Sequence, residues 1–184
     1  MIKHLITAVL ITCSACGVAN QMPEVRTIKD DFDGSTLHST FTNQLRNVEP
    51  SGNIAELNIL AGQLKGSSDW TWIANIKLSR QAGWPELTGL RVKISEADTL
   101  QIDQCQPEQV KATAQGYGHI SHLESIMCTV NRETVERLAN ATGAKVRFDA
   151  KNGADATLDQ INTNAIKDVL NRVDGITPLT TPPR

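Results

Sequence analysis

Four cysteines are the residues of this sequence with the widest choice of chemistry, and the first two are Cys13 and Cys16 in "CSAC". A C-x-x-C spacing occurs in thiol–disulfide redox motifs and in one half of many zinc sites. A redox motif of this type lies beside a strand–helix–strand pattern, and a zinc site needs two further ligands nearby. The surrounding sequence has neither, so we interpret this pair as part of a processing segment.

The residues around this pair have the three parts of a secretory signal. Lys3 gives the chain a basic start, residues 5–12 are almost entirely apolar, and small residues follow up to Ala19. The apolar run is too short to cross a bilayer as a helix, which takes roughly 20 such residues. We therefore expect residues 1–19 to be a signal peptide.

Two cleavage sites are compatible with this signal. The "CSAC" stretch resembles the lipobox of bacterial lipoproteins, in which a cysteine that follows two small residues is lipidated, although Cys13 stands where leucine is usual. The resemblance implies cleavage before Cys16 and a lipid on that residue. The alternative is ordinary cleavage after Ala19, with Gly17 as the second small residue, which would release a lipid-free protein.

The second pair of cysteines, Cys105 and Cys128, stays in the chain on either route. Thiols seldom stay reduced in an exported protein, so we predict a disulfide bond between these two residues. The bridge would stabilise the fold by roughly 3 kcal/mol, because of the length of the loop that it closes. The alternative is that both are free thiols in the core, where cysteine is common.

Polar and aromatic residues gather in "GYGHISHLE", which contains Tyr117, His119, His122 and Glu124. Two imidazoles and a carboxylate are a ligand set that binds zinc. On a continuous strand, however, His119 and His122 point to opposite faces, and only His122 and Glu124 share one. We therefore predict no metal site and interpret Tyr117, His119 and His122 as candidates for ligand binding at a strand junction.

Trp84 gives the strongest single indication of a binding role. It lies beside Pro85 in "QAGWPEL", a segment typical of a loop. A tryptophan exposed in a loop can anchor a partner protein or a sugar ring through its large apolar surface. The alternative is that Trp84 covers the edge of the core, in which we expect Trp70 and Trp72 to pack.

Motifs for catalysis are scarce in this sequence. It has no G-x-S-x-G nucleophile motif, no phosphate-binding glycine loop and no G-x-G-x-x-G, so we expect no cofactor. Acidic pairs such as Glu56 with Asp69, or Asp98 with Asp103, could serve a hydrolase if folding brought them together. We expect a non-catalytic binding or structural module. The alternative is a periplasmic hydrolase that uses such carboxylates or the region around His119 and His122.

Acidic and basic residues nearly balance, and the formal net charge is −2. A protein that binds nucleic acid has a basic surface, so nucleic acid is not an expected partner. Because no cluster of basic residues would bind an anionic membrane, membrane attachment would come from the lipid on Cys16. The other expected partner is a second envelope protein or a small ligand.

The candidate residues are carried by a body that reads mainly as strands. The alternation of apolar and polar residues in "WTWIANIKL" predicts a strand with one buried face, and "LRVKI" followed by "TLQID" predicts a hairpin. Weaker strand patterns occur in "STLHSTF", "AELNILAGQLKG", "VKATAQGYG" and "HLESIMCTV". We expect a tether over residues 20–30, one domain over residues 31–174 and a flexible tail over residues 175–184.

The last third of the domain is predicted to form a helix, a hairpin and a second helix. "NRETVERLANATG" begins with Asn131 as a helix cap, and "NTNAIKDVLNRVDG" has apolar residues at helical spacing. Asn152 and Gly153, between two short strand-like runs, indicate a tight turn. Together these patterns predict the α+β class: a mainly antiparallel β-sheet body with two helices that flank a β-hairpin near the C-terminus.

This layout, together with the "CSAC" box, is similar to small uncharacterised lipoproteins of the bacterial envelope. The resemblance implies a location on the periplasmic side of the envelope, with the lipid anchored in the outer membrane. Without the lipid, the protein would be soluble in the periplasm. The resemblance implies no particular activity.

Overall fold

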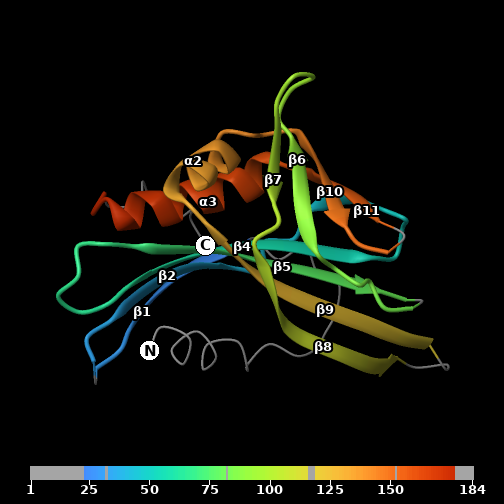
Figure 1. Cartoon of the computed structure of the whole chain (residues 1–184), viewed down its shortest axis with the longest axis horizontal. Helices are drawn as coiled ribbons and strands as arrows, with labels where there is room; N and C mark the ends of the chain where they lie inside the picture. The colour runs from blue at the N-terminus through green and yellow to red at the C-terminus, as the bar shows by residue number, and fades with distance from the viewer. Residues whose placement is uncertain (1–22, 32, 82, 116–118, 152, 177–184) are drawn as a thin grey trace, which may run out of the picture.

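The computed structural model describes residues 23–31, 33–81, 83–115, 119–151 and 153–176. Antiparallel strands in two sheets form its body, and two helices lie near the C-terminal end (Figure 1). The predicted α+β class with a mainly antiparallel β-sheet body is therefore confirmed. The expected signal peptide with Cys16, and residues 177–184 of the expected tail, lie outside the described residues.

The larger sheet, sheet A, has six strands in the order β1-β2-β4-β5-β9-β8, and the smaller one, sheet B, has five in the order β3-β11-β10-β6-β7. The strands of sheet A are Glu24–Lys29 (β1), Thr36–Phe41 (β2), Ile54–Gln63 (β4), Thr71–Arg80 (β5), Cys105–Gln115 (β8) and His119–Val130 (β9). The strands of sheet B are Arg46–Glu49 (β3), Gly89–Lys93 (β6), Thr99–Ile102 (β7), Ala144–Asp149 (β10) and Ala154–Leu158 (β11).

Side-chain alternation along β5 builds the centre of sheet A. Trp72, Ala74, Ile76 and Leu78 are each at most 5% exposed, as the sequence predicts. β4 and β9 pair with β5 in continuous antiparallel register, so their apolar residues join the same face. We call this buried side the inner face of sheet A. The predicted hairpin is also confirmed, because β6 pairs with β7.

The prediction of a tether over residues 20–30 is wrong for most of these residues. Glu24–Lys29 form β1, which pairs with β2 from Glu24 opposite Phe41 to Lys29 opposite Thr36. β1 is an edge strand of sheet A with mostly exposed or half-buried side chains, so its sequence lacks the alternation that marks β5. The hydrogen bonds to β2, rather than a buried face, define this strand.

The predicted helix, hairpin and helix near the C-terminus are confirmed as α2 (Arg132–Ala139), β10 with β11, and α3 (Gln160–Val173). Asn131 caps α2, since its side chain accepts a hydrogen bond from the backbone N–H of Thr134. α3 begins before the "NTN" stretch, because Asp159 and Asn162 form a reciprocal capping box.

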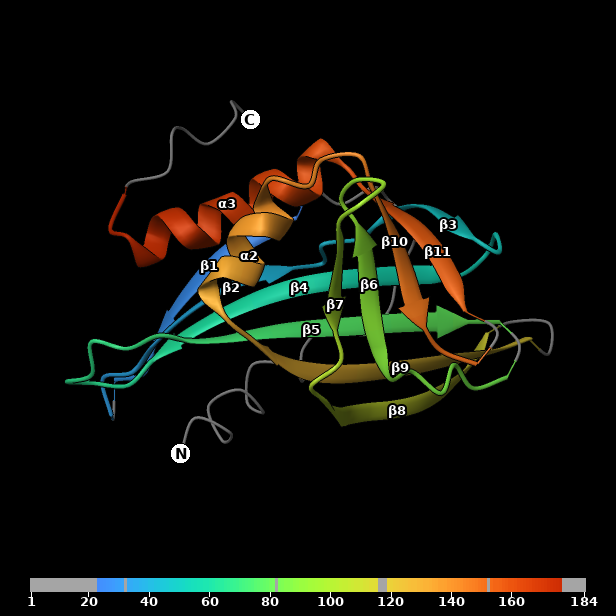
Figure 2. The same ribbon diagram turned by 45° about the horizontal axis from the view of Figure 1, so that its top comes forward.

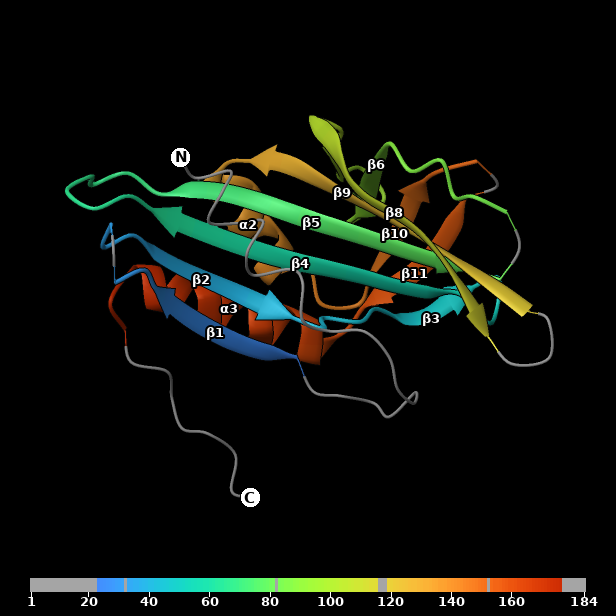
Figure 3. The ribbon, with the colours of Figure 1, turned by 90° about the horizontal axis from the view of Figure 1, so that it is seen from below.

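Both helices and sheet B lie on the inner face of sheet A (Figure 2). α3 packs over β1, β2 and β4, and the core between the layers includes Leu57, Val92, Phe148 and Ile166. Figure 3 shows the opposite side, where the strands of sheet A lie in front of the helices. Neither helix in the described ranges has the length and apolar character needed to cross a bilayer.

Candidate functional site

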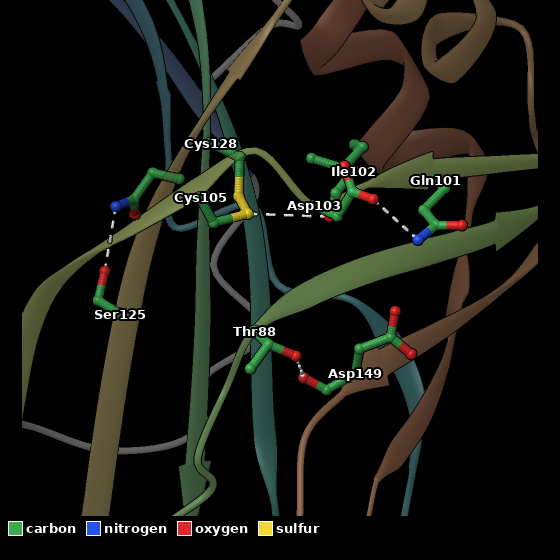
Figure 4. The surroundings of a disulfide bond; sticks show 9 residues. Thr88, Gln101, Ile102, Asp103, Cys105, Ser125, Cys128 and Asp149 are labelled. Carbon is green, nitrogen blue, oxygen red and sulfur yellow. Dashed lines mark hydrogen bonds between the residues drawn. A yellow bond between two sulfur atoms is a disulfide. The ribbon is translucent and has the colours of Figure 1, made fainter.

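Cys105 and Cys128 form the predicted disulfide bond, which ties the first residue of β8 to β9 (Figure 4). The two cysteines stand opposite each other in the antiparallel pair, with their Cα atoms 3.9 Å apart. Cys128 is fully buried, so the bridge belongs to the core rather than to an accessible redox site. The disulfide is consistent with an oxidising compartment outside the cytoplasm.

From this disulfide, β8 pairs with β9 at one edge of sheet A, and β9 pairs on its other side with β5 from Val130 to His122. We call the β8–β9 pair the ribbon. The register shifts once, between Pro107 and Gln109, where β8 contains a bulge. Beyond the bulge the pairing is regular up to Gln115 opposite His119. We call this regular part, residues 110–115 with residues 119–124, the second half of the ribbon. Because its register does not shift, each face carries a fixed set of side chains.

The second half of the ribbon presents a mainly apolar surface. Ala112 stands opposite His122 and His122 stands opposite Arg80, so alternation places Val110, Ala112, Ile120 and His122 on the inner face, with Glu124 opposite Val110. Val110 is 58% exposed and Ile120 is 48% exposed, which shows that sheet B does not cover this part of the inner face. The ribbon therefore extends the apolar inner face of sheet A into solvent.

Trp84 joins this surface from the loop between β5 and β6. Its side chain is 41% exposed, as predicted, and its ring lies edge-on to the His122 ring with 4.7 Å between centroids. We define the ribbon patch as Trp84, Val110, Ala112, Ile120 and His122. It holds three of the six large hydrophobic residues that are exposed in the described part of the chain.

The loop that carries Trp84 is fixed on both sides of this residue. Leu87 is buried in the core, and the carbonyl oxygen of Pro85 accepts a hydrogen bond of 2.8 Å from the backbone N–H of Lys151. Arg80 donates to the Lys151 carbonyl oxygen at 2.8 Å, and Lys151 Nζ lies 3.0 Å from Glu86 Oε1. These contacts tie the loop to the β10–β11 hairpin, so Trp84 is presented by a braced segment.

His122 is half-buried in this arrangement, and its Nδ1 atom is buried without a hydrogen-bond partner among the described residues. A buried polar atom without a partner is uncommon in folded proteins. The contact with the Trp84 ring therefore orients this imidazole by packing rather than by a hydrogen bond at Nδ1. A ring held in this way adds to an apolar and aromatic surface.

The structure thus brings two of the four ligand-binding candidates together, Trp84 and His122. Tyr117 lies outside the described residues, and His119 begins β9 but its side chain is not among those described. Within the described ranges, no group of three or more His, Cys, Asp or Glu side chains is arranged to hold a metal ion. Val110 and Ile120 were not predicted, because their shared face depends on the register between β8 and β9.

The carboxylates of the hydrolase alternative each contact a different neighbour. Glu56 lies 3.7 Å from Lys77, Asp69 accepts from Ser68, Asp98 pairs with Arg137, and Asp103 accepts from Gln101. A shallow depression of about 250 Å³ lies beside α2, lined by Ile94, Asp98, Glu133, Glu136, Arg137 and Asn140. It shares no residue with the ribbon patch, and its Asp98 carboxylate is bound to Arg137.

A comparison with known proteins gives no match to this chain: no family model, no curated protein and no solved structure.

Proposed function

We propose that this protein is an exported, non-catalytic binding module of the bacterial envelope that recognises another envelope protein through the ribbon patch. The observation that carries this proposal is the position of Trp84, Val110 and Ile120, all at least 41% exposed, around one end of the β8–β9 ribbon. Exposed apolar residues scattered singly need no explanation, whereas a contiguous group is typical of interaction sites.

The composition of the patch favours a protein partner. Tryptophan is enriched among the residues that contribute most to binding, because it offers a large apolar surface and an N–H donor. Charged side chains lie beside these apolar residues: Arg80 stands opposite His122, and Glu124 stands opposite Val110. An apolar centre with a polar rim is the usual composition of a protein–protein interface.

Two pairs of cysteines support the cellular location in this proposal. The Cys105–Cys128 disulfide supports an oxidising compartment, and the "CSAC" stretch supports a lipid on Cys16. In this proposal the lipid holds the protein at the periplasmic side of the outer membrane. The ribbon patch would then meet partners that lie in the same compartment.

Site-specific photo-crosslinking in intact bacteria tests the binding role. A photoreactive amino acid replaces Val110 or Ile120 in the patch, and Ile54 or Leu64 in matched controls, which are 40% and 38% exposed. We expect a discrete protein adduct from positions 110 and 120 and none from positions 54 and 64. Absence of adducts from the patch, or equal adducts from the controls, would contradict the proposal.

A further inference from the structure

Sheet A has two edges, and they differ in how they are protected. An edge strand presents backbone N–H and C=O groups that can pair with another chain, and charged residues on the strand oppose such pairing. β1, at one edge, has Glu24, Arg26 and Lys29 among its six residues. β8, at the other edge, has only Glu108 and Lys111 among its eleven.

Apart from the charge of Lys111, the protection of β8 lies in its first half. Pro107 cannot donate a backbone hydrogen bond, and the bulge between Pro107 and Gln109 interrupts the regular edge. Residues 110–115 follow without a further shift of register. In this stretch Val110 is 58% exposed, and Ala112 and Thr113 are also exposed. The second half of β8 is thus a regular strand edge with an exposed apolar side chain.

We infer that residues 110–115 from two copies of this chain pair with each other as antiparallel strands and join the two six-stranded sheets edge to edge. A two-fold axis perpendicular to the sheets relates the copies in such a pair. This axis keeps the inner faces on the same side, so inner-face residues must stand opposite inner-face residues. The condition is met only when the two-fold axis passes through a residue, which then stands opposite its own copy. It is not met when the axis passes between two residues.

One register fits the sequence of β8 better than its neighbours. Centred on Ala112, it places Ala112 opposite its own copy, Lys111 opposite Thr113, and Val110 opposite Ala114. Centred on Lys111, it would place two like charges directly opposite each other, which is unfavourable. Centred on Thr113, it would place Val110 opposite position 116, beyond the end of β8. The register centred on Ala112 avoids both problems.

The consequence of this pairing is a larger binding surface. Edge pairing occupies the backbone of β8 and leaves the inner face open, so the two ribbon patches would lie side by side on one continuous sheet. This inference goes beyond the proposed binding role, because a monomer could also bind a partner through one patch. Its test must therefore measure contact between two copies rather than capture of a partner.

Disulfide trapping in the cell envelope provides that test with the full, processed protein. In Ala112→Cys, the new thiol faces its own copy across the two-fold axis, within reach of a disulfide. Thr99→Cys is the matched control, because Thr99 is exposed on β7, an edge strand of sheet B. We expect a dimer on non-reducing gels from Ala112→Cys alone, with peptide mapping that identifies the bond between the two residues 112.

Charge exchange then tests the register. Adding Thr113→Lys to Ala112→Cys places like charges opposite each other twice in each dimer, and should slow dimer trapping by roughly tenfold. Adding Lys111→Glu as well should restore trapping, because opposite charges then face each other. Thermal unfolding of each variant shows that the fold is retained, since Thr113 is exposed. No trapped dimer, equal trapping from the Thr99→Cys control, or no effect of Thr113→Lys would each overturn the inference.

Discussion

Trp84 and Trp72 show how one residue type takes two roles in this protein. Trp84 is 41% exposed and contacts the ring of His122, whereas Trp72 is 5% exposed in the core. Replacing Trp84 by alanine should therefore lower the free energy of unfolding by only about 1 kcal/mol, the value of one aromatic contact. Replacing Trp72 by alanine should cost about 3–5 kcal/mol, because it leaves a cavity.

Urea denaturation of both variants measures these changes. A loss of stability for Trp84→Ala as large as that for Trp72→Ala would show that Trp84 is part of the core. In that case its role in the ribbon patch would be structural. A small loss leaves this side chain available for a partner.

His38 is a second residue whose surroundings predict a measurable effect, in this case on how stability depends on pH. It is 7% exposed, stacks on Trp70, and its Nδ1 lies 2.8 Å from Thr27 Oγ1, which accepts a hydrogen bond from Arg172. The Thr27 hydroxyl is therefore free to donate to Nδ1, as a neutral imidazole requires. Burial, and after it the charge of Arg172, lowers the pKa of His38, and the nearby Asp168 opposes this shift only in part.

The lowered pKa of His38 predicts a pH dependence of stability. In the unfolded chain the His38 imidazole takes up a proton at an ordinary pKa of about 6.5. The neutral form of His38 therefore makes its full contribution to the free energy of unfolding above this pH. It is lost as the pH falls toward the lowered pKa of the folded state. The free energy of unfolding should therefore drop as the pH falls below about 7.5, and the drop should be smaller in His38→Gln. Equal drops in the two proteins would contradict this assignment.

Among the elements, the β8–β9 ribbon depends most on a single covalent bond. The disulfide joins residues separated by 23 positions, and its removal should lower the free energy of unfolding by about 3 kcal/mol. The change is Cys105→Ala together with Cys128→Ala, measured by thermal unfolding. Thr99→Ala, an exposed substitution that keeps the native disulfide, is the control. An unchanged midpoint would show that pairing with β9 alone secures β8.

Elements with a buried face were predictable from sequence, and elements defined by their neighbours were not. β5 alternates cleanly, and α2 has a capping residue at Asn131 and buried residues at helical spacing. β1 and β3 are short, mostly polar edge strands without a buried face; β1 pairs with β2, the next strand along the chain, and β3 pairs with the distant β11. Trp84 was identifiable as an exposed loop residue, but its contact with His122 depends on strand pairing that no local pattern encodes.

At the scale of the whole molecule, the proposed location makes a prediction about mass. The processed protein isolated from bacterial envelopes should begin at Cys16 and carry the added mass of a lipid. Intact-mass measurement, with alkylation before and after reduction, also reports the disulfide, because Cys105 and Cys128 should react only after reduction. A lipid-free chain that begins at Asn20 would place the protein in solution in the periplasm and leave the ribbon patch as its only proposed point of attachment to a partner.

The central claim is that the ribbon patch binds another envelope protein. The most direct test measures the affinity between this protein and the partner that is crosslinked to the photoreactive residue at position 120. Calorimetry would compare the unchanged protein with Ile120→Ser and with Ile54→Ser, a matched loss of an exposed apolar side chain elsewhere. We expect the dissociation constant to rise roughly tenfold or more for Ile120→Ser, as for a residue at the centre of an interface, and to stay unchanged for Ile54→Ser. Equal dissociation constants for all three proteins would contradict the claim.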